Sequence, residues 1–101
     1  MKEKLEIIIY QINELCKDYY FSKQYNVLGT AKNMLPNIQD FMTEILSGNN
    51  FELSEDEYEG LKKFTIDLME DIVSALENED VVLIIDSFDY GLRTLVDIFL
   101  N

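Results

Sequence analysis

Apolar residues recur at alternating spacings of three and four along four segments of the chain. This spacing places them along one side of an α-helix and is typical of helices packed nearly parallel in a left-handed bundle. The sets are Leu5, Ile8, Ile12, Leu15 and Tyr19; Leu28, Ala31, Leu35, Ile38, Met42 and Ile45; Leu61, Thr65, Leu68, Ile72 and Ala75; and Val81, Ile85, Phe88, Leu92, Leu95 and Phe99. The pattern therefore predicts an all-α protein.

Capping and turn residues suggest where the helices begin and end. Ser22 and Asp80 can each accept a hydrogen bond from the first turn of a helix, and Ser54 with Glu57 three residues later forms a capping-box pattern. The turn-forming residues 47–50 indicate where the second helix stops. The predicted helices span about 2–20, 22–47, 55–78 and 81–100.

Pro36 conflicts with the second predicted helix, because a proline inside a helix removes a hydrogen bond and clashes with the preceding turn. It could instead be the first residue of a separate helix. The apolar spacing continues across position 36 without a change of phase. We therefore favour one helix that is kinked at Pro36.

The predicted connections between these helices are short. Short connections force helices that are neighbours in sequence to run in opposite directions. The 101 residues are enough for one domain with one core. The sequence thus predicts a single domain, residues 1–101, folded as an up-down-up-down antiparallel four-helix bundle.

The composition excludes several kinds of chemistry. The chain has no histidine and one cysteine, so it cannot form a Ser-His or Cys-His nucleophile pair, a histidine-ligated metal site or an internal disulfide. Its longest apolar run, residues 81–85, is too short to span a membrane, and its N-terminus lacks the apolar core of a signal peptide. We expect a cytoplasmic protein that has no cofactor and no metal site.

The acidic residues are unevenly distributed. Residues 1–50 carry five bases and six acids, whereas residues 51–101 carry three bases and fourteen acids, and the whole chain has a net charge of −12. Such a field repels nucleic acid and anionic membranes. It could attract a basic protein partner, or it could simply keep the domain soluble.

The helix predicted at 81–100 is apolar over most of its circumference. A four-helix bundle buries only about half of each helix, so the surplus implies a groove or a partner. Alternatively, long neighbouring side chains cover it. Apolar residues on the outer side of the helix at 55–78 could extend the same patch. The candidate contact residues are Val82, Leu83, Tyr90, Val96, Ile66 and Val73.

Two segments and the single cysteine are candidates for functional chemistry. The sequence Asp86-Ser87-Phe88 resembles the Asp-Ser-Leu of acyl carrier proteins, but Ser87 lies inside an unbroken apolar pattern, which favours an ordinary surface serine. Residues 49–57 are acidic but lack the central glycine of a calcium-binding EF-hand loop. Cys16 flanks the first apolar stripe, where a buried structural thiol is expected.

Two carboxylate pairs resemble the magnesium-chelating motifs of all-α nucleotide pyrophosphatases. Glu52 precedes Glu55 by three residues, and Glu77 precedes Asp80 by three. The pairs flank opposite ends of the third predicted helix, about 30 Å apart at 1.5 Å per residue, which is too far to share an ion. A Mg²⁺-dependent enzyme is therefore kept only as an alternative.

Residues 75–83, together with Asp86, Tyr90 and Leu92, resemble a family of small acidic helical Firmicutes proteins that have an uncharacterised domain. In size, acidity and helix number the chain is also similar to flagellar export chaperones of the FliS kind. That similarity implies a helical bundle whose outer groove binds a segment of another protein.

These observations lead to a hypothesis and a structural alternative. The first is a non-enzymatic interaction module, chaperone-like or adaptor-like, that binds an amphipathic or basic segment in an apolar groove beside the helix at 81–100. The alternative is a homodimeric structural protein in which the same surface pairs with itself.

Overall fold

The computed structural model describes residues 2–21 and 24–100, with the backbone alone at 24 and 25. These residues form helices joined by short turns and one longer loop, and no strand occurs among them. The prediction of an all-α helical bundle is confirmed. The elements are α1 (Lys2–Tyr20), α2 (Gln24–Leu46), α3 (Glu55–Glu77), α4 (Val81–Asp86), the π-helix η1 (Ser87–Leu92) and α5 (Arg93–Leu100).

The predicted caps of the third and fourth helices are confirmed. The Glu57 amide donates to Ser54 Oγ at 3.1 Å, and the Ser54 amide donates to Glu57 Oε1 at 3.0 Å. At the next helix start, the Leu83 amide donates to the Asp80 carboxylate. The predicted cap at Ser22 lies outside the described residues.

Helix α2 is one helix that continues through Pro36. This agrees with the unbroken apolar spacing and excludes a separate helix beginning at the proline. Pro36 lies on the exposed side of α2, where its ring does not displace core side chains. The kink at this position stays a prediction.

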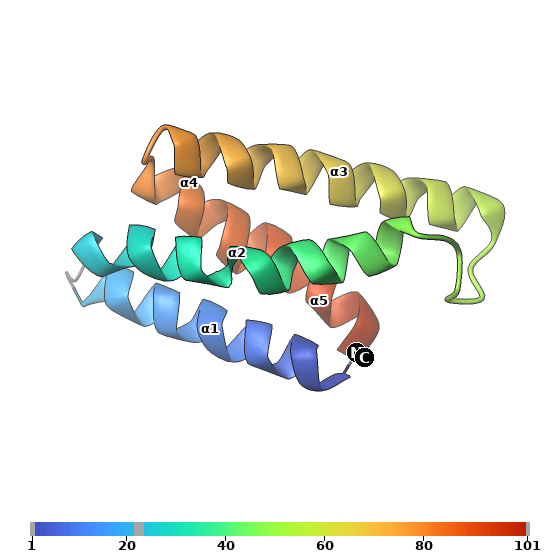
Figure 1. The fold of residues 1–101 in the computed structure, drawn as a ribbon, viewed down its shortest axis with the longest axis horizontal. Helices are drawn as coiled ribbons and strands as arrows, with labels where there is room; N and C mark the ends of the chain where they lie inside the picture. Colours follow the sequence, from blue (N-terminus) through green and yellow to red (C-terminus); the bar gives the residue numbers. More distant parts are fainter. Residues whose placement is uncertain (1, 22–23, 101) are drawn as a thin grey trace.

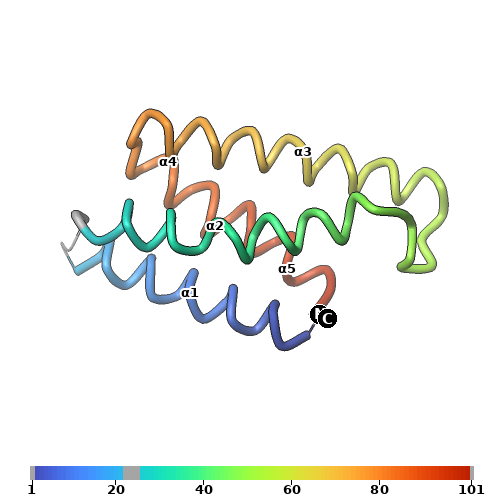
Figure 2. Tube along the Cα trace, viewed as in Figure 1, coloured from blue at the N-terminus to red at the C-terminus, as the bar shows by residue number. Residues whose placement is uncertain are grey.

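Successive helices run in opposite directions in Figure 1. α1 packs against α2, α2 packs against α3, and the final helical segment α4–η1–α5 packs between α3 and α1. Figure 2 shows α1 and α2 lying side by side, with α3 on the far side of α2. The four rods therefore surround one core.

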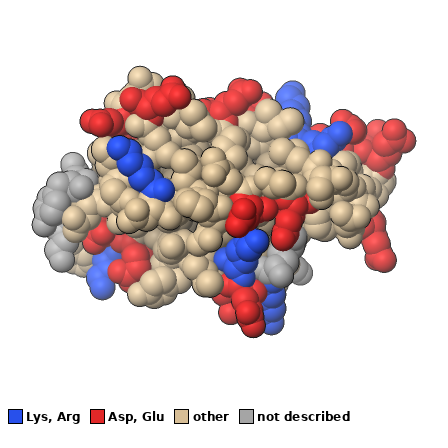
Figure 3. Space-filling model, viewed as in Figure 1, with Lys and Arg blue, Asp and Glu red and all other residues tan. Residues whose placement is uncertain are grey.

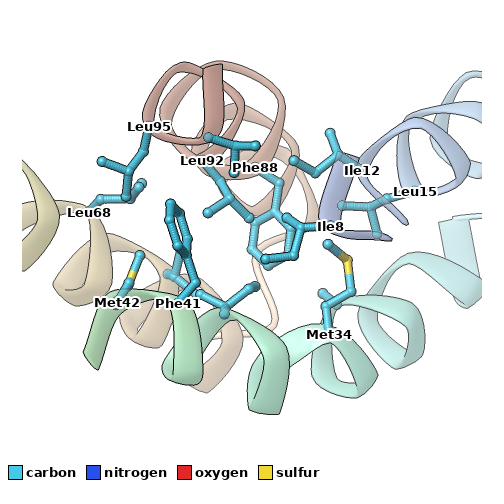
Figure 4. Packing of buried hydrophobic residues seen from close by; sticks show 14 of the residues in the cluster. Ile8, Ile12, Leu15, Met34, Phe41, Met42, Leu68, Phe88, Leu92 and Leu95 are labelled. Carbon is cyan, nitrogen blue, oxygen red and sulfur yellow. The ribbon is translucent and has the colours of Figure 1, made fainter. Parts of the chain in front are cut away.

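The core is almost entirely aliphatic and aromatic. Its largest buried side chains come from every helix, and Figure 4 shows Phe41, Phe88 and Leu68 pointing into the same space. The Tyr58 hydroxyl donates to the Ile45 carbonyl at 2.7 Å, which ties α3 to the end of α2. Burial of this continuous cluster is the main stabilising contribution to the fold.

The core side of α2 differs slightly from the predicted one. Leu28 and Leu35 are only partly buried, whereas Val27, Met34 and Phe41 are fully buried. Each of these three lies one residue before a predicted core position, so α2 is rotated about its axis by a fraction of a turn. The pattern identified the right stripe but not its centre.

The final helix differs from the prediction in its middle. Residues 81–100 are helical throughout, but η1 has the wider i→i+5 turn of a π-helix. Such a turn holds one residue more than an α-helical turn. Leu92 and Leu95, predicted in the core, are buried, and Val96, predicted on the outer surface, is buried as well at 0% exposed.

None of the helices in the described part of the chain combines the length and the hydropathy needed to cross a membrane.

Candidate binding groove

The final helical segment lies diagonally across the bundle. α4 and η1 contact α3, whereas α5 contacts α1 instead. Figures 1 and 2 both show α5 turning away from α3 toward α1. Where they separate, Phe64 of α3 is exposed, while Leu61 and Leu68 on the core side of α3 stay buried.

The first hollow of the resulting groove lies where α3 faces α4 and η1. It has a volume of about 240 Å³, and its walls are apolar side chains with carboxylates among them. Its lining residues are Phe64, Asp67, Leu68, Asp71, Leu83, Asp86, Ser87 and Gly91.

The second hollow lies where α5 has separated from α3. It has a volume of about 300 Å³ and is lined by Leu53, Glu57, Gly60, Leu61, Phe64 and Ile98. Phe64 borders both hollows, so the two form one continuous surface along α3, which we call the α3 groove. The ring of Phe64 is 39% exposed between them, an unusual position for a large aromatic side chain.

Gly91 allows the close approach of η1 to α3 in the first hollow. A Cβ atom placed on Gly91 would lie 2.5 Å from Cδ1 of Leu68, which is far inside van der Waals contact. The neighbouring Ser87 is 7% exposed and lines the first hollow beside residues of α3. The prediction that Ser87 is a surface serine is therefore wrong.

The charge along the α3 groove has a single sign. Asp67, Asp71 and Asp86 line the first hollow and Glu57 lines the second, while neither lining contains Lys or Arg. Figure 3 shows acidic side chains along the edge of the molecule where α3 lies in Figure 1. An apolar groove with an acidic rim favours a ligand that is itself apolar on one side and basic beside it.

Glu57 differs from the other acidic residues of the groove because its carboxylate also caps α3. The hydrogen bond from the Ser54 backbone amide, followed by that with the Ser54 side chain, lowers the pKa of Glu57. A lowered pKa means that the folded state favours the ionised form. Its contribution to stability is present above the ordinary glutamate pKa and is lost as the pH falls through the lowered value.

The structure places the six predicted contact residues in different settings. Leu83 lines the first hollow. Val82 and Tyr90 are exposed at 59% and 68% but do not line the groove. Ile66 borders a third depression with Glu59, Lys62 and Lys63, which meets the first hollow at Asp67. Val73, also exposed, borders neither hollow of the groove. Val96 belongs to the core, so its prediction as a contact residue is wrong.

Several residues that line the groove were not among the predicted contact residues. They include Phe64, Gly60, Gly91 and Ile98. Gly60 and Gly91 have no side chain and gave no apolar signal. Ile98 lines the second hollow and is 53% exposed.

The carboxylate pairs suggested for magnesium stand at the two ends of α3. Glu52 and Glu55 lie before and at its start, and Glu77 and Asp80 lie at and after its end. With 23 residues, α3 separates the pairs by roughly 30 Å. Across residues 2–21 and 24–100, no group of three or more acidic, cysteine or histidine side chains has the arrangement of a metal site.

A polar cluster joins α1 to η1 on the other side of the final helix. Arg93 Nη2 lies 3.0 Å from Asp89 Oδ1 and donates to Asn13 Oδ1 at 2.8 Å. Burial raises the pKa of the nearby Cys16 thiol, and the charge of Asp89 raises it further, against an opposing effect of Arg93. The thiol is therefore mostly protonated at neutral pH and is a weak nucleophile, which fits a structural role.

Comparison of the chain with protein-family models, with curated proteins and with solved structures finds no match. The α3 groove is therefore the feature of the molecule from which a function can be inferred.

Proposed function

We propose that this protein is a non-enzymatic, cytoplasmic interaction module that binds a basic amphipathic helix of another protein in the α3 groove. The observation that carries the proposal is the strip formed by the two hollows beside α3, whose apolar walls include the exposed Phe64 and which acidic side chains border. An amphipathic helix is the kind of ligand that covers such a strip, because it presents apolar residues along one side.

Charge selects the type of helix. Asp67, Asp71 and Asp86 stand around the first hollow, and lysine or arginine residues beside the apolar stripe of the ligand would face them. A second copy of this chain is disfavoured as the occupant, since it also carries a net charge of −12 and would bring like charges together. The acidic groove thus supports a basic partner over a homodimer.

The proposal predicts that a groove substitution abolishes binding of a defined probe. The probe is a synthetic helix of about 15 residues with leucine along one side and lysine beside it, long enough to be helical when bound. Leu83→Lys places a positive charge in the first hollow and removes an apolar wall. We expect it to weaken binding by about 2 kcal/mol or more, measured by isothermal titration calorimetry.

Val73→Lys is the matched control, because it makes the same change of charge on an exposed apolar residue that borders neither hollow. A second control is a probe in which every lysine is replaced by glutamate. Equal losses for the two protein variants, or equal affinity for the acidic and basic probes, would contradict binding in the α3 groove.

A further inference from the structure

The two hollows of the α3 groove are spaced to receive two side chains of one bound helix. Leu68 lies in the first hollow and Leu61 in the second, and both belong to the same side of α3. Seven residues separate them, which corresponds to about 10.5 Å along a helix. Two side chains at positions i and i+7 of a helical ligand have the same separation and the same orientation.

A glycine lines each hollow. Gly91 lets η1 lie against Leu68 in the first hollow, and a Cβ atom placed on Gly60 would meet nothing within 4 Å in the second. Phe64 stands between the hollows and separates them into two depressions. A ligand therefore meets two distinct sites joined by an aromatic ridge.

The acidic charge is concentrated at one of the two depressions. The carboxylates of Asp67, Asp71 and Asp86 line the first hollow, whereas the second has Glu57, whose carboxylate already accepts the Ser54 amide hydrogen bond. The first hollow consequently favours an apolar side chain flanked by basic residues, and the second favours an apolar side chain alone.

We infer that the partner helix inserts two apolar anchors at i and i+7, the basic-flanked anchor into the first hollow and the other into the second. This inference rests on the proposed function and specifies the register of the ligand. It distinguishes the α3 groove from a general acidic surface, to which any basic helix would bind with similar affinity.

The inference is tested with Gly60→Leu. Gly60 lines the second hollow, and a Cβ atom at this position would meet nothing within 4 Å, so a leucine side chain there can occupy the hollow. Gly29→Leu is the matched control, since Gly29 is also exposed within a helix, has open space around it and lies outside both hollows. The probe is a helical peptide of about 15 residues with leucines at i and i+7 and lysines flanking one of them. A melting curve for each variant verifies that it folds.

We expect Gly60→Leu to weaken binding of this probe about tenfold or more, the effect of losing one buried leucine, and Gly29→Leu to leave it unchanged. Changing the unflanked leucine of the probe to alanine should remove the sensitivity to Gly60→Leu. A second probe with leucines at i and i+5, which point to different sides of the helix, should bind about tenfold more weakly than the first.

The outcomes separate the two levels of the proposal. If no probe binds the unmodified protein, the proposed function itself is wrong. If the probes bind, lose affinity with Leu83→Lys, and yet are insensitive to Gly60→Leu or to the leucine spacing, the groove is used but the two-anchor register is wrong. If sensitivity is lost instead when the lysine-flanked leucine is changed, the basic-flanked anchor occupies the second hollow and the assignment is overturned.

Discussion

Gly91 has no side chain because Leu68 of α3 occupies the space where one would stand. At Gly29 and Gly60 the same space is open, so neither position requires glycine for packing. Packing thus requires glycine at position 91 but not at positions 29 and 60, a difference that the sequence does not show. The difference arises from how closely another helix approaches each one.

Alanine substitutions at these glycines are expected to change stability in opposite directions. Gly29→Ala and Gly60→Ala should raise the free energy of unfolding by about 0.5–1 kcal/mol, because alanine favours the helix and restricts the unfolded chain. Gly91→Ala should lower it by about 1 kcal/mol, because overpacking against Leu68 costs about 1–3 kcal/mol and outweighs the helix preference. Urea denaturation measures all three. Stabilisation by Gly91→Ala would contradict the prediction and show that the Leu68 side chain moves aside at little cost.

At the scale of elements, the π-helix η1 separates α4 from α5 within the final helical rod. After it, Leu95 and Val96 are buried and Ile98 is exposed beside the groove. The apolar pattern predicted the burial of Leu95 but placed Val96 on the outer surface. Because a π-turn holds one additional residue, we expect its geometry to influence which residues of α5 face the core.

Single-residue deletions can test the role of η1. Deleting Tyr90, which is exposed within η1, should convert the segment to an α-helix while leaving the downstream residues in place. Deleting Thr94, an exposed residue of α5, should move Leu95 to an exposed position and Asp97 into the buried position of Val96. We expect the second deletion to cost about 3 kcal/mol or more beyond the first.

Circular dichroism and thermal denaturation of the two deletion variants provide the measurement. The Tyr90 deletion should keep its helical signal and a cooperative transition. Equal destabilisation by both deletions would mean that the π-turn does not set the phase of α5.

At the scale of the whole molecule, the arrangement of four rods leaves one side of α3 incompletely covered. Three helices are 19 to 23 residues long, and the fourth rod is divided among α4, η1 and α5. Because this rod begins against α3 and ends against α1, it closes the core at one end and opens a groove at the other. The proposed function is therefore a consequence of the crossing direction of one helix.

The whole-molecule charge predicts a monomer. A net charge of −12, with the acids concentrated in the half of the chain that forms the α3 groove, disfavours pairing of two copies through that surface. Light scattering at micromolar concentration should give the mass of a single 11.8 kDa chain at low and moderate salt. A dimer that dissociates on Leu83→Lys would contradict the prediction and favour the homodimeric alternative.

Much of the fold follows from the sequence, because helix formation and capping depend on residues close together in the chain. The spacing of apolar residues predicted all four helical segments, and the side chains of Ser54, Glu57 and Asp80 predicted two of their starts. Leu83, predicted as a contact residue from the apolar surplus of the final helix, lines the first hollow, and its contact with a partner stays a prediction.

The tertiary structure alone decided the rest. The heptad pattern contains no signal for the π-helix η1 or for the burial of Val96 and Ser87. The two hollows depend on the angle between α3 and the final helix, which is set by side chains distant in sequence, such as Leu68 against Gly91. Local preferences thus determined which segments are helical, while long-range packing determined which surface of those helices remains open to a ligand.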